Sequence, residues 1–276
     1  MLSTIFLYIS IDCFPDIQGN SVFSDLKKHN VSVIILENSN LPDKAFKKEE
    51  TLFVSDNKDF LSMIQNSGYF GVGFSKKNIF LPVKYVFECF SDLDFLYFEH
   101  ILQRYLGKPI TIFSGKNLLI RELSNEDLLS LFRFCEAFRN TTFIQGMATD
   151  FTNFQKQFQS YIANVYPFYD FGLWGVFSNE DNRLIGLFGL QNTTIDGQEE
   201  IELGYLLDTA YRRKGYAKEA ILSIFEYARQ VLACNRIVAK IHKDNTPSIA
   251  TALSCGMQFE KNLSTPADHV LYVIHM

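Results

Sequence analysis

The sequence predicts an α/β protein built from two parts. In residues 1–110, short β-branched and aromatic segments alternate with amphipathic ones, which is typical of strands and helices in a parallel sheet. In residues 117–276, three strand-like segments follow one another across turn-rich connections, which predicts an antiparallel meander. Turn signals at 107–109 and 114–117 lie between these two stretches. We therefore expect one domain at 1–110 and a second at 117–276.

Composition restricts the class of protein. Hydrophobic residues make up 47% of the 276 residues, enough core for two domains, and the net charge of −5 argues against a nucleic-acid binder. The five cysteines are odd in number and lack CxxC spacing, so we expect neither a disulfide framework nor a zinc site. The apolar N-terminus has no basic leader, and no apolar run approaches the ~20 residues of a membrane helix. These observations favour a cytoplasmic protein that does not bind membranes.

Each element of the first part follows from its residue pattern. The β-branched segment 31–36 predicts a strand that is buried on both faces. Gly68 is placed to end a helix because glycine adopts the left-handed conformation easily. The predicted strands are 5–11, 31–36, 51–55, 69–74 and 85–89, and the predicted helices are 21–29, 58–66 and 94–106. This alternation predicts a three-layer α/β domain.

The second part begins with a strand and ends with two. Ser124 and Asp127 have capping-box spacing at the start of a helix that runs to about residue 138. A helical repeat over 151–165 is expected to stop before Pro167. The meander is 172–177, 184–191 and 200–207, followed by a helix after Gly215, a strand at 236–241, a helix at 247–254, and strands at 257–261 and 270–275.

Residues 211–217, Tyr-Arg-Arg-Lys-Gly-Tyr-Ala, stand between a strand and a helix. Free N–H groups at a helix N-terminus and the helix dipole attract anions. Arg212, Arg213 and Lys214 add full positive charges, and Gly215 lets the backbone approach a bulky anion. The turn predicts a binding site for a diphosphate.

The order of elements around this turn resembles the GNAT superfamily of acetyl-CoA-dependent N-acyltransferases. The resemblance covers residues 117–276 and includes Arg212-x-x-Gly215-x-Ala217, then Asn245-Thr-Pro-Ser248 one strand later. It is strongest to the ribosomal-protein alanine N-acetyltransferase branch. It implies a mixed, mostly antiparallel sheet flanked by helices and acetyl-CoA as co-substrate.

The same resemblance implies where acetyl-CoA binds. Its pantetheine arm is expected along 205–207, and its acetyl carbonyl near the amides of Leu206 and Leu207, which would stabilise an oxyanion. Asn245 and Ser248 are expected to order the arm. The diphosphate is expected on the amides of 213–217, so the expected coenzyme-binding residues are Leu206, Leu207, Arg212, Arg213, Lys214, Gly215, Tyr216, Ala217, Asn245 and Ser248.

A base is needed because the attacking amine is protonated at neutral pH. Glu202 is the first candidate, since its apolar neighbours favour partial burial and a raised pKa, and an exposed strand glutamate is the alternative. His242 is a second candidate. Ala252 stands where the family often has a tyrosine that protonates the thiolate. Either Tyr205 or Tyr216 donates the proton to the thiolate in place of that tyrosine, or the thiolate leaves unprotonated.

The first part resembles, over residues 20–106, the core of the haloacid-dehalogenase (HAD) superfamily. The similar segment is 52–57, in which Asp56 follows a strand, and a helix comes next. The paired Asp-x-Asp of that family is absent, because Asp12 is followed by Cys13-Phe14. We therefore expect a degenerate HAD/Rossmann-like domain without catalysis, with magnesium-dependent phosphatase activity as the rejected alternative.

The sequence thus predicts an N-acetyltransferase that moves the acetyl group of acetyl-CoA to a primary amine, either a peptide or protein N-terminus or a small molecule. The alternative is a non-catalytic acyl-CoA-binding or protein-interaction module, favoured by Ala252 and by the degenerate first part. We expect a monomer or homodimer that needs no metal.

Overall fold

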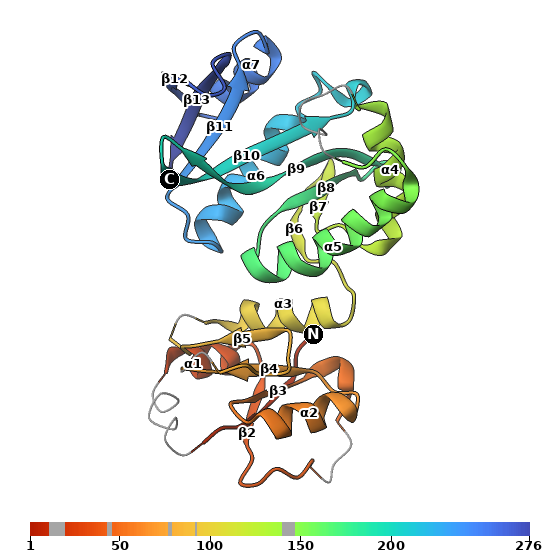
Figure 1. Ribbon diagram of the computed structural model, residues 1–276, viewed down its shortest axis with the longest axis vertical. Coiled ribbons are helices and arrows are strands. Elements are labelled where there is room, and N and C mark those ends of the chain that lie inside the picture. The colour runs from red at the N-terminus through yellow and green to blue at the C-terminus, as the bar shows by residue number, and fades with distance from the viewer. Residues whose placement is uncertain (11–19, 43–45, 77–78, 92, 140–146) are drawn as a thin grey trace. The chain divides into compact units, whose positions relative to one another are not determined.

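The computed structural model describes residues 1–10, 20–42, 46–76, 79–91, 93–139 and 147–276 (Figure 1). The chain divides into two compact units, Met1–Lys108 and Pro109–Met276. Each unit has its own sheet and its own buried core. Among the described residues, no helix is long and apolar enough to cross a membrane.

The first unit is a five-stranded parallel sheet with the strand order β2-β1-β3-β4-β5. Because β2 and β3 lie on opposite sides of β1, the sheet is doubly wound. Its strands are β1 (Thr4–Tyr8), β2 (Ser32–Ile35), β3 (Thr51–Ser55), β4 (Gly71–Phe74) and β5 (Tyr85–Phe87). Its helices are α1 (Ser21–Lys28), α2 (Lys58–Asn66) and α3 (Phe95–Tyr105).

Helices cover both faces of this sheet. Apolar side chains of α1 and α3 pack on the face that carries Ile5 and Leu52. The opposite face carries Phe6 and Phe53, which pack with Phe60 of α2. Alternation along each strand therefore supplies two separate cores. The three layers follow the predicted pattern, whereas the HAD-like resemblance stays a prediction.

One expectation for the first unit was wrong. We expected residues 31–36 to form a strand buried on both faces, but β2 is an edge strand, and Ile34 and Ile35 are 37% and 47% exposed. A run of β-branched residues indicates a strand without showing whether a neighbour covers each side of it.

Part of the HAD-like segment can be placed. Asp56 follows β3, and its carboxylate accepts hydrogen bonds from the Ser10 amide at 3.1 and 3.2 Å. Asp12 and Cys13 lie outside the described residues.

Cys89, Cys135, Cys234 and Cys255 are free thiols.

The second unit is an eight-stranded sheet with the order β12-β13-β11-β10-β9-β8-β7-β6. In the described chain β10 and β11 are parallel and the other neighbouring strands are antiparallel, as the predicted mixed sheet requires. The strands are β6 (Thr111–Ser114), β7 (Leu118–Arg121), β8 (Leu173–Ser178), β9 (Leu184–Ile195), β10 (Gln198–Leu207), β11 (Arg236–His242), β12 (Gln258–Asn262) and β13 (His269–His275).

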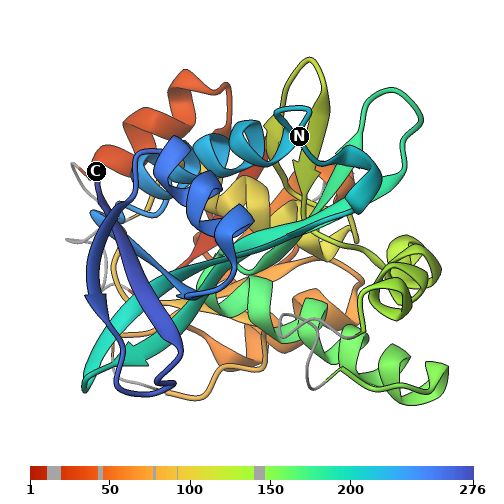
Figure 2. The same ribbon diagram turned by 90° about the horizontal axis from the view of Figure 1, so that it is seen from above.

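Four helices flank this sheet, two on each face (Figure 1). They are α4 (Leu128–Ala137), α5 (Phe151–Tyr169), α6 (Tyr216–Gln230) and α7 (Thr246–Ser254). Apolar residues of α6 and α7 pack on the face that carries Leu203 and Ile241, in a core that Tyr166 near the end of α5 also joins. Apolar residues of α4 and of the first half of α5 pack on the face that carries Leu206. Figure 2 shows the β12–β13 hairpin at one edge of the unit, beside α7.

Two elements of the second unit differ from the prediction. Residues 111–114, which we assigned to the boundary, form β6 and pair with β7. Helix α5 continues to Tyr169 instead of stopping before Pro167. Pro167 falls in the last turn, so the helix gives up one hydrogen bond, to the Ala163 carbonyl, and ends two residues later. The preceding Tyr166 anchors this turn, because its hydroxyl donates to the Leu173 carbonyl at 2.5 Å.

Candidate active site

The turn before α6 presents its backbone amides outward. Arg213 and Gly215 have positive φ angles of 59° and 88°, which bend the chain into a concave turn. None of the amides of 213–218 donates a hydrogen bond to the described chain, and the helix ladder begins with the Glu219 amide on the Gly215 carbonyl. A Cβ at Gly215 would meet nothing within 4 Å. The predicted cradle therefore has free donors and open space for a diphosphate.

The three basic side chains of this turn are exposed but do not act alike. Arg212 Nε donates to the Leu207 carbonyl at 3.2 Å and so ties the turn to the end of β10. Lys214 Nζ lies 5.5 Å from the centre of the Tyr211 ring. The Arg213 side chain forms no hydrogen bond or ion pair with the described residues, and its charge remains available to an anion. Tyr216 and Ala217 form the first turn of α6.

Strands β10 and β11 separate beside the cradle. Their backbones are paired at Glu202 and Val238, yet β10 continues to Leu207 and β11 to His242. Over the same stretch β10 stays paired with β9 as far as Leu207, and β11 stays paired with β13 as far as His242. The outer pairings hold while the central one opens, so a wedge is left between the carboxyl ends of two parallel strands.

The register of β10 decides which of its amides face this wedge. The Asp208 amide donates to the Ile185 carbonyl of β9, and the ladder continues without a bulge through Leu206 opposite Leu187. Because N–H groups alternate in direction along an antiparallel strand, the Leu206 amide points at β9 and the Leu207 amide points at the wedge. Of the two amides predicted to hold an oxyanion, Leu207 is the one so directed.

Tyr205 connects the two walls of the wedge. Its ring stacks on Phe188 with centres 5.5 Å apart, and its hydroxyl donates to the Ser248 carbonyl at 3.0 Å. Asn245 caps α7 by accepting the Ser248 amide at 3.2 Å. Burial raises the pKa of Tyr205, so the hydroxyl keeps its proton at neutral pH. The structure thus brings three of the predicted residues together at the start of α7.

Comparison with known proteins identifies this arrangement. Residues 117–258 match the family model described as an acetyltransferase (GNAT) domain, which is half of the chain. The chain belongs to the GNAT acetyltransferase family. It is an acetyl-CoA-dependent acetyltransferase, and residues 213–218 with the wedge are chemically suited to the diphosphate and arm of that co-substrate.

Relatives and solved structures agree with this family. The chain is 26% identical over 153 residues to the probable N-acetyltransferase YjcK of Bacillus subtilis. This match covers 55% of this chain and 80% of YjcK. RimL, a ribosomal L7/L12 alpha-N-protein acetyltransferase, matches with a TM-score of 0.53 at 16% identity, over 61% of this chain and 96% of RimL. RimL in complex with coenzyme A matches with a TM-score of 0.51 at 17% identity, over 60% and 98%.

In this GNAT acetyltransferase, Glu202 lies on the sheet face opposite α6 and α7. It is only 7% exposed, so the alternative of an exposed strand glutamate was wrong. Its Oε2 accepts from Gln191 Nε2 at 3.1 Å and lies 3.0 Å from Lys240 Nζ. Sequence reasoning missed Lys240, although alternation along β11 from Val238, which pairs with Glu202, places it on the same face.

His242 lies at the carboxyl end of β11, on the same face as Glu202. Its Nδ1 accepts the Asp244 amide at 3.2 Å, which places the neutral-form proton on Nε2. Its ring lies edge-on to that of His269, with centres 5.3 Å apart. In this arrangement the accepting lone pair of His242 is already used, which favours Glu202 as the base.

The residues considered as acids have different surroundings. Ala252 of α7 is fully buried and packs in the core. The position that often carries a tyrosine in this family is therefore a packing position here. The Tyr216 ring packs edge-on to Tyr211, with centres 5.7 Å apart, in the cradle. Tyr205 therefore reaches the start of α7 from the sheet, whereas Tyr216 belongs to the turn before α6.

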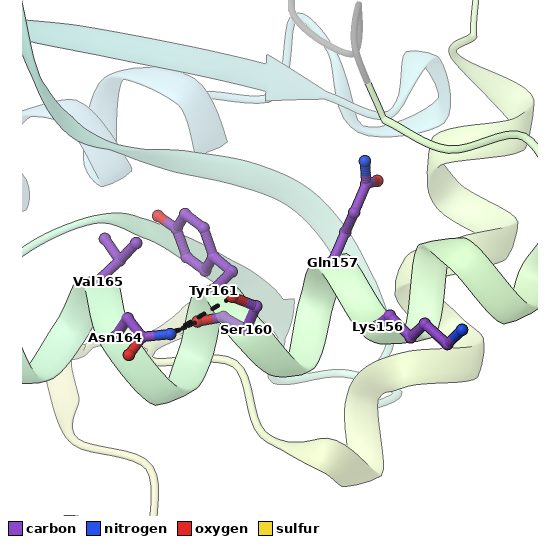
Figure 3. A pocket seen from close by; sticks show the side chains of 6 residues that line it. All are labelled: Lys156, Gln157, Ser160, Tyr161, Asn164 and Val165. Atoms are coloured by element: carbon purple, nitrogen blue, oxygen red, sulfur yellow. Dashed lines mark hydrogen bonds between the residues drawn. The ribbon is translucent and has the colours of Figure 1, made fainter.

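A shallow depression of about 530 Å³ runs along α5 (Figure 3). It is lined by Lys156, Gln157, Ser160, Tyr161, Asn164 and Val165, and Asn164 Nδ2 donates to the Ser160 carbonyl at 2.8 Å. Gln157 accepts the Ala148 amide at 2.8 Å, which ties α5 to the segment before it. None of the predicted site residues lines this depression.

Several acidic residues of the second unit serve mainly as structural partners. Asp196 pairs with Lys261 at 2.8 Å, Glu200 pairs with Arg236 at 3.1 Å, and Asp150 caps α5. Their charges are thus largely compensated locally. Across the described ranges, no three His, Cys, Asp or Glu side chains form a group that could hold a metal ion.

Proposed function

We propose that this protein transfers the acetyl group of acetyl-CoA to a primary amine by direct attack on the thioester. The observation that carries this proposal is the wedge between β10 and β11, which opens beside the free amides of 213–218. A thioester whose diphosphate binds those amides can place its arm in the wedge. There the Leu207 amide is positioned to donate to the developing oxyanion.

The proposed reaction removes two protons from the acceptor ammonium and returns one to the leaving thiolate. Glu202, directly or through a water molecule, takes a proton from the acceptor ammonium, and the amine lone pair then attacks the carbonyl carbon. The C–N bond forms, the tetrahedral intermediate collapses, and the C–S bond breaks with coenzyme A as the leaving thiolate. Tyr205 supplies the proton to that thiolate and regains one from the attacking nitrogen, which thereby becomes the neutral amide, with Asn245 and Ser248 ordering the wall that holds the tyrosine.

The proposed acceptor is a peptide or protein N-terminus or a small-molecule amine. Support comes from the relatives, since YjcK is described as a probable N-acetyltransferase and RimL as an alpha-N-protein acetyltransferase. For the first unit we propose a degenerate HAD-like domain, residues 1–110, that packs or recognises without catalysis. Its Asp56 is followed by Asn57, which caps α2 instead of supplying a second carboxylate.

Acetyl-CoA is expected to raise the melting temperature of the protein. At a coenzyme concentration of 100 Kd, binding to the folded state adds about 2.7 kcal/mol of stability, or roughly 5–10 °C for a domain of this size. A thermal shift titration measures this, and thiol release on a panel of peptides and small amines then measures transfer. An unchanged melting temperature at millimolar acetyl-CoA contradicts the proposal, and binding without thiol release on any amine supports the non-catalytic module.

Tyr205→Phe is expected to lower kcat about tenfold or more, because the variant has no proton to give the thiolate. It also loses the bond to the Ser248 carbonyl, a contribution of about 1 kcal/mol to stability. Tyr161→Phe is the matched control, since its buried hydroxyl bonds the Leu173 amide. If both variants keep full kcat, the thiolate leaves unprotonated and the role of Tyr205 is structural.

A further inference from the structure

Lys240 bridges three strands at the narrow end of the wedge. It lies two residues beyond Val238, the last position at which β11 pairs with β10. Its Nζ is 3.0 Å from Glu202 Oε2 on β10 and 2.7 Å from Thr193 Oγ1 on β9. The ammonium therefore sits where the two central strands begin to separate.

The Lys240–Glu202 pair is well shielded from water. The side chains are 27% and 9% exposed, whereas those of the surface pair Lys261–Asp196 are 40% and 57% exposed. Shielded charges interact more strongly than exposed ones, and a buried carboxylate without its cation would be costly. A lysine that only formed a surface ion pair would be as exposed as Lys261, whereas Lys240 lies in a shielded position.

Other groups around Glu202 leave one part of its carboxylate open. From β9, Gln191 donates to Oε2, the same oxygen that Lys240 contacts. Glu200 of β10 and Arg236 of β11 lie on the same face and pair with each other. His242 of β11 and His269 of β13 also lie there, and burial, with the neighbouring His242 as a second cause, lowers the pKa of His269. At neutral pH His269 is uncharged, so Lys240 is the cation that acts on the carboxylate. Within the described part of the chain, Oε1 makes no hydrogen bond or ion pair, and it stays available as the base.

We propose that Lys240 is the positioning residue of the catalytic base: it keeps Glu202 ionised and holds Oε2 in place, so that Oε1 receives the proton of the acceptor ammonium. The inference rests on the proposed function of Glu202. Lys240 itself forms and breaks no covalent bond. Its ammonium favours the carboxylate over the carboxylic acid, and the two held contacts on Oε2 fix the plane of the carboxylate.

The test compares kcat–pH profiles of the full chain with acetyl-CoA and the acceptor amine both saturating. Lys240→Met is expected to move the acid limb of the kcat–pH profile to higher pH by about one pH unit. The reason is that the Glu202 carboxylate loses the cation that disfavours its protonation. At pH values on that limb kcat should then fall about tenfold, with KM for acetyl-CoA unchanged. Lys240→Arg keeps the cation and should restore most of kcat and the original limb. Lys261→Met, which removes a lysine from an exposed pair, should leave the profile unchanged.

A second measurement does not depend on turnover. Urea unfolding of wild type, Lys240→Met, Glu202→Gln and the double variant gives the coupling between the two side chains. Coupling in unfolding together with a moved acid limb supports the proposal. Coupling together with an unmoved acid limb of the kcat–pH profile overturns the proposal, because Lys240 then only stabilises the packing of the strands. Absence of coupling between the two side chains overturns the proposal as well. No thiol release by the wild type overturns the proposed function itself, a result separate from the variant comparison.

Discussion

Glu202→Gln is expected to lower kcat by about 10²–10⁴-fold, the range that a general base contributes. Glutamine has nearly the same shape and still offers an oxygen to Lys240 and Gln191, but its amide cannot accept a proton at neutral pH. The affinity for acetyl-CoA should not change, because Glu202 lies at the narrow end of the wedge and away from the cradle. Thiol release under saturating substrates, together with a coenzyme binding titration, separates the two quantities.

Glu199→Gln is the matched control for this variant. Glu199 lies three residues earlier on β10, is exposed, and accepts from Thr194 Oγ1 at 3.1 Å. The same change of charge on the same strand should leave kcat as it is. If Glu202→Gln retains full kcat, the base is elsewhere, and His242→Gln is the next variant to measure.

Gly215→Ala is expected to weaken acetyl-CoA binding by at least about tenfold. Gly215 has a φ of 88°, a conformation that costs a residue with a side chain about 1–2 kcal/mol. The added methyl would also project into the open space that the diphosphate is proposed to fill. Both effects act on the turn that presents the amides of 213–218.

Gly197→Ala separates these two effects. Gly197 lies in the β9–β10 turn with a φ of 82°, and a Cβ there also meets nothing within 4 Å. Both variants should therefore lose a similar amount of unfolding free energy, measured in urea, while only Gly215→Ala loses coenzyme affinity. Equal coenzyme affinities in the two variants would show that the turn at 211–217 is not the diphosphate site.

The elements that the sequence predicted well carry strong local signals. Segments 51–55 and 58–66 were predicted with the observed bounds, since a β-rich run and an Asn57-capped amphipathic helix adjoin there. The second meander turn was recognised from Asp196-Gly197, whose φ angles are both positive. The cradle could be predicted for the same reason, because its strand, glycine and helix are contiguous in the sequence.

What the sequence left open depends on neighbours that are distant along the chain. Nothing local at 31–36 tells whether another strand will cover β2, and nothing at Pro167 tells that Tyr166 is anchored to the next strand. The direction of the Leu206 and Leu207 amides follows from pairing with β9, and the partner of Glu202 comes from β11. Motifs therefore predicted the turn that we propose binds the coenzyme, whereas the environment of Glu202 required the sheet register.

The bond from Arg212 to the Leu207 carbonyl has a consequence for the choice of acetyl donor. It fixes the distance between the amides that we propose bind the phosphates and the amide that we propose binds the acetyl carbonyl, because both ends belong to one short, braced stretch of chain. On this proposal, the fixed distance selects acetyl donors by the length of the arm between phosphate and acetyl group. A carrier in which the phosphate adjoins the acetyl group is too short to satisfy both ends, and a long flexible arm such as pantetheine can do so.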